Sequence, residues 1–234
     1  MPKLKSIVAS LIFVLVVPSI SFAGALIGDY NILPETLPAG FQPWAGTKSP
    51  AGTYIVAGTY NGQSAYLEVS KNPDGSASLS QVHTLDSLDL AAGGSRNAGI
   101  VRDVYFNAQG ELEFVGSSST PNPNVDPNFR EATVWNASGV PTALGILPGA
   151  DESQMFQGSR NGLYAGGSRN DPTLFSATGN PTNLTTSDYG IAVAISKDGS
   201  VIAGSVDGRM AYWTANVIGV DYSEHSVEIP SGGF

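Results

Sequence analysis

The sequence predicts an all-β fold, built as a β-propeller-like array of four blades with about four short antiparallel strands in each. Three observations predict it. A pattern of turn, short strand and glycine occurs four times along the chain. The segment "TVWNASGVPTAL" (residues 133–144) returns forty residues later as "TLFSATGNPTNL" (residues 173–184). After residue 23, no segment shows the apolar spacing of three and four residues that an amphipathic helix requires.

The N-terminal segment "MPKLKSIVASLIFVLVVPSISFAG" has the three zones of a cleavable secretory signal. Two lysines precede an uncharged apolar stretch over residues 7–17, and small residues lead up to Ala23. The apolar stretch is too short to span a bilayer comfortably, so an uncleaved anchor is the less favoured alternative. We therefore expect a signal peptide over residues 1–23 with cleavage near Ala23. Export to the periplasm or the extracellular space would leave a single repeat domain over residues 24–234.

The composition limits both the classes of partner and the sources of stability. The chain carries 20 acidic residues against 11 lysines and arginines, and this net charge of −9 disfavours binding to nucleic acid and to anionic membranes. It contains no cysteine, so packing and not disulfide bonds must stabilise an exported domain, which fits a bacterial envelope or extracellular protein. We expect no nucleic-acid partner, and no membrane insertion once the signal is removed.

The repeated unit begins with a hairpin that occurs four times, in "AGTYIVAGT" (51–59), "QGELEFVGS" (109–117), "NGLYAGGS" (161–168) and "DGSVIAGS" (198–205). Its turn glycine tolerates the positive φ of a tight turn, and its β-branched and aromatic residues suit a half-buried strand. Its closing glycine permits a bulge or the close approach of a neighbouring backbone. The turn glycines are Gly52, Gly110, Gly162 and Gly199, and the closing glycines are Gly58, Gly116, Gly167 and Gly204.

Each hairpin is followed by a strand that carries an aromatic residue, then by a turn and a further short strand. About four strands in about forty residues is the size of a propeller blade, which cannot cover both of its own faces. We therefore expect the aromatic residue of each repeat to pack between neighbouring blades. These residues are Tyr66, Trp135, Phe175, and Tyr212 with Trp213.

The repeats are unevenly spaced, and two insertions account for the excess length. Residues 70–90 include "NPDGS", which indicates an extra hairpin, and residues 119–131 read as an exposed, proline-containing loop. A fifth, degenerate blade is an option if residues 24–50 supply its strands. We expect either a small closed propeller, in which residues 222–229 pair with residues 25–35, or a piece of a longer protein. An open array would favour self-association.

The segment "LGILPGADESQMFQGSRNGLYAGGSRNDP" (144–172) resembles the HAF-repeat family of bacterial extracellular proteins. Two further stretches resemble the same repeat, "AISKDGSVIAGS" (194–205) and the aromatic strand "MAYW" (210–213), although the histidine of the family's name is absent from every copy. The resemblance covers residues 50–234 and implies a secreted, propeller-like array without catalytic activity. The matching positions in the first segment are Leu144, Gly145, Leu147, Gly149, Ser153, Asn161, Gly162, Gly167 and Ser168.

The residues offer little catalytic or metal-binding chemistry. His83 and His225 are far apart in sequence and cysteine is absent, so neither a zinc site nor a Ser-His-Asp triad is expected. "NPDGS" (72–76) and "NPNVDPN" (122–128) lack the dense aspartates of a calcium loop, and "AAGGSRNAG" (91–99) lacks the Gly-Lys-Thr ending of a phosphate loop. We assign no catalytic, cofactor-binding or metal-binding residue.

Paired carboxylates need separate consideration, because two acids are the usual machinery of glycan cleavage. The pairs are Asp151 with Glu152, Asp86 with Asp89, and Glu111 with Glu113, the last at a spacing that places both on one face of a strand. On an acidic surface such pairs are more often solvated than reactive. We therefore expect a non-enzymatic binding or surface-interaction module for a protein or glycan ligand. The alternative is a polysaccharide-acting hydrolase or lyase that draws its acid and base from Asp151, Glu152 or their neighbours.

Overall fold

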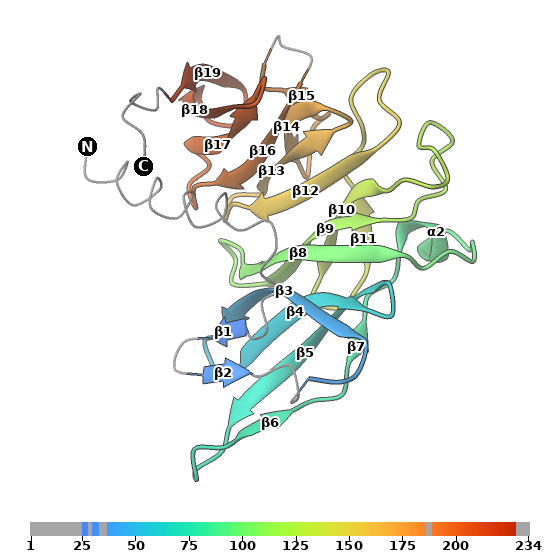
Figure 1. The fold of residues 1–234 in the computed structure, drawn as a ribbon, viewed down its shortest axis with the longest axis vertical. Coiled ribbons are helices and arrows are strands. Elements are labelled where there is room, and N and C mark those ends of the chain that lie inside the picture. The colour runs from blue at the N-terminus through green and yellow to red at the C-terminus, as the bar shows by residue number, and fades with distance from the viewer. Residues whose placement is uncertain (1–24, 28–29, 33–36, 186–188, 228–234) are drawn as a thin grey trace.

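The computed structural model describes residues 25–27, 30–32, 37–185 and 189–227. Nearly all regular structure in these ranges is β-strand, gathered in four antiparallel sheets that follow one another along the chain (Figure 1). The all-β prediction is therefore confirmed, with four strands in line in each sheet. The expected signal peptide lies outside the described residues, and none of the helices within them is long and apolar enough to cross a membrane.

We number the sheets 1 to 4 in chain order. Sheet 1 holds β3 (Phe41–Lys48), β4 (Tyr54–Tyr60), β5 (Gln63–Lys71) and β6 (Ala77–Leu79), with β7 (His83–Thr84) also paired to β5. Sheet 2 holds β8 (Gly99–Phe106), β9 (Leu112–Ser118), β10 (Glu131–Asn136) and β11 (Pro141–Ala143). Sheet 3 holds β12 (Ser153–Gly158), β13 (Leu163–Ser168), β14 (Asp171–Ser176) and β15 (Thr182–Asn183), and sheet 4 holds β16 (Gly190–Ile195), β17 (Val201–Val206), β18 (Arg209–Val217) and β19 (Asp221–Ser226). The remaining elements are the paired β1 (Ala25–Ile27) and β2 (Tyr30–Ile32) and the short helix α2 (Leu88–Ala91).

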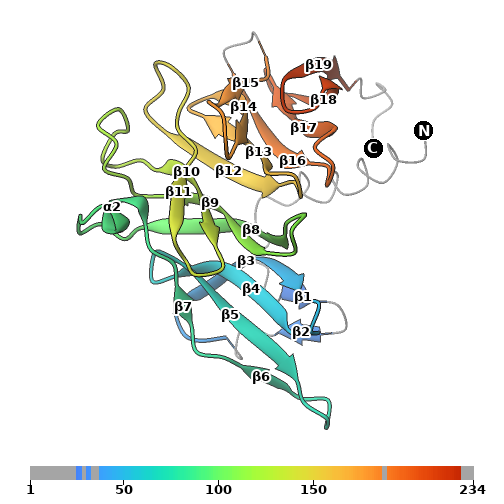
Figure 2. The same ribbon diagram turned by 180° about the vertical axis from the view of Figure 1, so that it is seen from behind.

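Each sheet packs on the next, so the four form a row that runs from sheet 1, in blue, to sheet 4, in red (Figures 1 and 2). The first strands β3, β8, β12 and β16 lie beside one another, and each is an edge strand of its own sheet. We refer to the side of the molecule formed by these first strands as the inner edge. In the part of the chain that the structure describes, the extensive contacts between sheets join neighbours in chain order, and none closes a ring from sheet 4 to sheet 1.

Turn glycines begin the repeated hairpins as predicted. Gly52, Gly110, Gly162 and Gly199 have φ values of 94°, 78°, 75° and 72°. Because this left-handed region strains any residue with a Cβ, these four positions favour glycine, which explains why the same turn letter recurs in every repeat.

A bulge in the first strand recurs at the same place in all four sheets. The pairing with the second strand shifts around one unpaired residue in each sheet, namely Trp44, Arg102, Phe156 and Val193. A glycine of the second strand lies beside each bulge, and a Cβ there would overlap a backbone carbonyl oxygen of the first strand; these are Gly58, Gly116, Gly166 and Gly204. The prediction that the closing glycine permits a bulge and a close backbone approach is therefore confirmed for Gly58, Gly116 and Gly204. For sheet 3 the prediction of Gly167 is wrong. Its neighbour Gly166 holds that position, because the chain has two adjacent glycines there.

The buried aromatic residues lie between sheets. Trp135, Phe175 and Trp213 are fully buried, and each belongs to a core cluster that it shares with the preceding sheet. The prediction that a repeated aromatic packs between neighbours is confirmed for these three. Tyr66 also lies between sheets 1 and 2, with its ring centroid 4.8 Å from that of Phe114, but it is not their equivalent. The register gives that place to the buried Leu67, so the matching of Tyr66 to the later aromatics was wrong by one residue.

The C-terminal strand completes sheet 4 and does not reach the N-terminal segment. β19 pairs with β18 along its length, and β1 pairs with β2. For the described residues, the predicted pairing of 222–229 with 25–35 is therefore wrong. The physical reason is that residues 221–226 supply the fourth strand that sheet 4 would otherwise lack. The two insertions behave as expected: the first contains the hairpin strand β6 as well as β7, and the second is a loop that leads into β10.

Candidate functional site

The two histidines occupy equivalent places in the first and last sheets, a relation that their sequence contexts did not reveal. His83 lies across from Tyr66 and His225 across from Tyr212, and each pair of rings is stacked, with centroids 4.9 Å and 4.8 Å apart. His225 also forms a hydrogen bond of 2.9 Å with Thr214 Oγ1. Because the histidines belong to separate sheets, they do not form one catalytic or metal site.

Glu111 and Glu113 do lie near each other, as their spacing predicted, but their oxygens are already bound. Asn107 Nδ2 donates to Glu113 at 2.8 Å and to Glu111 at 3.4 Å. The Tyr105 hydroxyl donates to Glu113 at 2.7 Å, and the Tyr164 hydroxyl of sheet 3 donates to it at 3.4 Å. Burial and the nearby carboxylate raise the pKa of both tyrosines. Glu113 thus joins sheets 2 and 3 by hydrogen bonds, which is a structural role.

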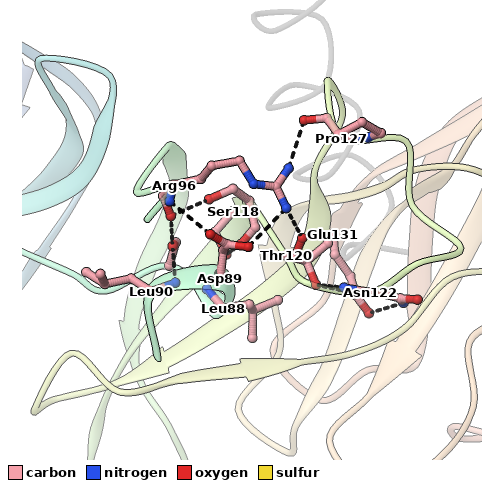
Figure 3. Close-up of polar contacts among 11 residues, drawn as sticks. Leu88, Asp89, Leu90, Arg96, Ser118, Thr120, Asn122, Pro127 and Glu131 are labelled. Carbon is pink, nitrogen blue, oxygen red and sulfur yellow. Dashed lines mark hydrogen bonds and ion pairs between the residues drawn. The ribbon is translucent and has the colours of Figure 1, made fainter. Parts of the chain in front are cut away.

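Arg96, in the glycine-rich segment 91–99, ties the two insertions together (Figure 3). Its guanidinium forms an ion pair with Asp89 of α2 at 3.0 Å and donates to the backbone carbonyls of Thr120 and Pro127. Its backbone N–H donates to the same carboxylate at 2.9 Å, and these hydrogen bonds lower the pKa of Asp89. The Asp86 carbonyl oxygen accepts a hydrogen bond from the Trp135 indole at 2.6 Å. This segment therefore anchors loops, and the Asp89 carboxylate of the Asp86–Asp89 pair is bound by Arg96.

The oxygen-rich loops use their side chains to make turns. Asp74 accepts hydrogen bonds from the backbone and hydroxyl of Ser76, and Asp126 accepts from the backbone and amide of Asn128. Within the described ranges, no group of three or more histidine, aspartate or glutamate side chains could hold a metal ion.

Asp151 and Glu152 immediately precede β12 at the inner edge, and both are half-buried. Burial raises the pKa of Glu152 above its ordinary value, and the charge of Asp151 raises it further. A raised carboxyl pKa is what a general acid needs near neutral pH, so this pair keeps the chemistry on which the hydrolase alternative depends.

The bulges bring together residues that the sequence did not single out. A bulge lets one side chain leave the alternation of the strand, and the four bulges lie on neighbouring first strands. Arg102 Cζ lies over the Trp44 ring, 4.4 Å from its centroid, and over the Phe156 ring, 5.8 Å from its centroid. Trp44 is 50 % exposed. We refer to Trp44, Arg102, Phe156 and Val193 as the bulge ladder.

In sheets 2 and 3, the side chain of the residue after the bulge forms a hydrogen bond with the backbone of the next sheet. Asp103 Oδ2 accepts a hydrogen bond of 3.0 Å from the Gly158 N–H, and Gln157 Oε1 accepts one of 2.9 Å from the Ile195 N–H. The other Asp103 oxygen accepts from the Val104 N–H at 2.8 Å. Burial raises the pKa of Asp103 to about 6, against the effect of these hydrogen bonds. The acid next to Arg102 is therefore committed to the backbone and gives that arginine no counter-charge.

Among the described residues, Arg102 is the charged residue that has a buried side-chain nitrogen without a hydrogen-bond partner. Its Nε is buried without a hydrogen-bond partner, and its guanidinium has no ion pair with any described residue. Burial lowers its pKa from the ordinary value, and the nearby charge of Arg130 lowers it further. Aligning the four hairpins on their closing glycines would not have revealed the ladder, because the bulge residue precedes that glycine by 14, 14, 10 and 11 residues in sheets 1 to 4.

No protein-family model matches the chain, and a search of curated proteins finds no match either. The bulge ladder at the inner edge combines a half-exposed tryptophan with an arginine whose Nε lacks a hydrogen-bond partner.

Proposed function

We propose that this chain is a secreted, non-enzymatic binding module of HAF-like, β-propeller-like repeats, and that its ligand binds at the bulge ladder. The single observation that carries the proposal is the half-exposed Trp44 stacked on an arginine that has no counter-ion. An exposed aromatic ring beside unused hydrogen-bond donors is typical of a ligand site and has no evident packing purpose.

The propeller-like arrangement is supported by the order of the strands. Four consecutive four-stranded antiparallel sheets pack face to face, with the first strands side by side and the last strands at the opposite edges. Propeller blades have this order, and propellers often bind ligands where the first strands meet. The ligand is a protein or a glycan; the net charge of −9 argues against a nucleic acid.

The absence of enzymatic activity is supported by the state of the candidate acids. Glu113 is bound by Tyr105 and Asn107, and Asp89 is bound by Arg96. The second candidate, a polysaccharide-acting hydrolase or lyase, is favoured by one observation, the raised pKa of Glu152 beside Asp151. Release of reducing ends from a polysaccharide panel, lost in Glu152→Gln, would establish that alternative.

The binding function is tested by a glycan array and a pull-down with the mature chain, residues 24–234. We expect Trp44→Ala to abolish capture of whichever ligand the wild-type chain retains. Val140→Ala is the matched control, because Val140 is 54 % exposed but lies in the turn before the outer strand β11. If no ligand is captured, or if both variants behave alike, the proposal is wrong.

A further inference from the structure

The Arg102 guanidinium is held in a geometry that leaves its hydrogen bonds unused. Its Cζ lies over the Trp44 ring, 4.4 Å from the centroid, and over the Phe156 ring, 5.8 Å from the centroid. A cation–π contact satisfies none of the guanidinium N–H groups, which remain able to donate to an acceptor. Its Nε nevertheless has no partner and is buried. The aromatic rings therefore position the Arg102 guanidinium without accepting hydrogen bonds from its N–H groups.

No described residue forms an ion pair with this arginine, although acids outnumber lysines and arginines by 20 to 11 in the full sequence. The adjacent Asp103 is bound by the N–H groups of Gly158 and Val104. Burial lowers the pKa of Arg102, and the charge that lowers it further is a like charge, that of Arg130, which has no ion pair with a described residue. A partly buried cation next to another cation is unfavourable unless an anion completes the site. An anionic ligand group would remove that cost.

We propose that the bulge ladder binds the carboxylate of an acidic sugar, with Arg102 as the bidentate donor and Trp44 and Phe156 as the surfaces beside the sugar ring. A guanidinium donates two parallel hydrogen bonds to a carboxylate, and the exposed half of the Trp44 ring offers an apolar face. The net charge of −9 repels a dense polyanion at long range, so we expect a ligand that needs one carboxylate at the site. This inference depends on the proposed binding function and specifies its ligand.

The experiment is a titration of the mature chain with tetragalacturonate, tetraguluronate and sialyllactose, each compared with its neutral methyl ester. Intrinsic fluorescence reports the site directly, because Trp135 and Trp213 are fully buried while Trp44 is half-exposed. We expect at least one acidic sugar to bind, and esterification to weaken it at least about tenfold, as the loss of a charged hydrogen-bonded pair should. Sodium acetate and sodium sulfate at the same ionic strength should not reproduce the signal.

Two arginine variants separate this site from general charge effects. Arg102→Gln should weaken the acidic sugar at least about tenfold and abolish the preference over the ester, whereas Arg102→Lys should recover only part of it. Arg209→Gln is the matched control, because Arg209 is an exposed arginine at the start of β18 in sheet 4. The Arg102 side chain makes no hydrogen bond to a described residue, so its variants should keep the wild-type urea midpoint.

The outcomes distinguish this inference from the broader proposal. If none of the acidic sugars binds, if the esters or simple anions bind equally well, or if Arg102→Gln changes nothing, the acidic-sugar inference is overturned. Suppose that a neutral glycan or a protein is captured by the wild-type chain and by Arg102→Gln, but not by Trp44→Ala. This result would support the binding function and overturn the acidic-sugar inference. Failure of every ligand would overturn both.

Discussion

Replacing Gly166 by alanine should destabilise the protein strongly, because the second strand of each sheet approaches the bulged first strand closely at this position. A Cβ on Gly166 would lie 2.9 Å from Met155 Cα and 3.0 Å from the Gln154 carbonyl carbon, and nearer still to the carbonyl oxygen. The clashing atoms are backbone, so no side chain can rotate away. β12 would have to move off β13, with strain and weakened ladder hydrogen bonds. Overpacking of this kind and about one lost hydrogen bond together cost about 3 kcal/mol.

The adjacent Gly167 provides the control within the same strand. A Cβ there would meet its nearest atoms at 3.5 Å and 3.6 Å, which is ordinary contact. Gly167→Ala should therefore stay within about 1 kcal/mol of wild type, and the lower entropy of its unfolded chain favours the variant. In urea denaturation with a slope of about 2 kcal/mol per molar, Gly166→Ala should lower the midpoint by about 1.5 M and Gly167→Ala should leave it nearly unchanged. Equal midpoints for the two variants would refute the assigned register.

Three further predictions concern charge, chain closure and export. Burial raises the pKa of Asp103 to about 6 from an ordinary 3.8. Between these two values the folded chain keeps a proton that the unfolded chain has lost. The free energy of unfolding should therefore fall by up to about 3 kcal/mol between pH 4 and pH 7. Urea denaturation across this range should show a shallower fall for Asp103→Asn, and parallel curves would contradict the assignment. Deleting residues 221–234 removes β19 and leaves β18 as an unpaired edge, so light scattering should detect aggregation; a soluble, equally stable product would show that β19 contributes nothing. Replacing residues 12–16 by a charged run should leave an uncleaved precursor in the cytoplasm, and normal export on an immunoblot would rule out the signal.

The β-sheet architecture could be predicted because the repeat is expressed through backbone requirements. Positive φ at Gly110 and Gly162 and the close approach at Gly116 each demand glycine, so the same letter recurs wherever the same geometry does. Register was less predictable, because a shift of one residue exchanges the two faces of a strand while preserving its composition. For this reason the sequence pattern predicts Tyr66 at the place that Leu67 holds, and Gly167 at the place that Gly166 holds.

The candidate site could not be predicted in the same way, because its residues share a position and not a chemical type. The stack of Arg102 on Trp44 joins strands that are more than fifty residues apart in sequence, and only the packing of β8 on β3 brings them together. The charged candidates that the sequence indicates are pairs of acidic residues that lie close together in the sequence. In the structure, one member of each of two pairs is bound locally: Asp89 by Arg96, and Glu113 by Tyr105.

The four repeats distinguish positions whose residue type the fold constrains from positions at which the residue type varies. At the position beside the bulge every sheet has glycine. At the equivalent position of the third strand every sheet has a large buried apolar residue, namely Leu67, Trp135, Phe175 and Trp213, and in sheets 2 to 4 this residue faces the preceding sheet. The bulge residue itself varies in size, charge and aromaticity, from Trp44 to Arg102 to Val193. Packing therefore makes no common demand there, because an unpaired residue on an edge strand is released from both the ladder and the alternation of faces. The fold does not require a cation over two aromatic rings at such a position, and ligand binding is the role that we propose for it.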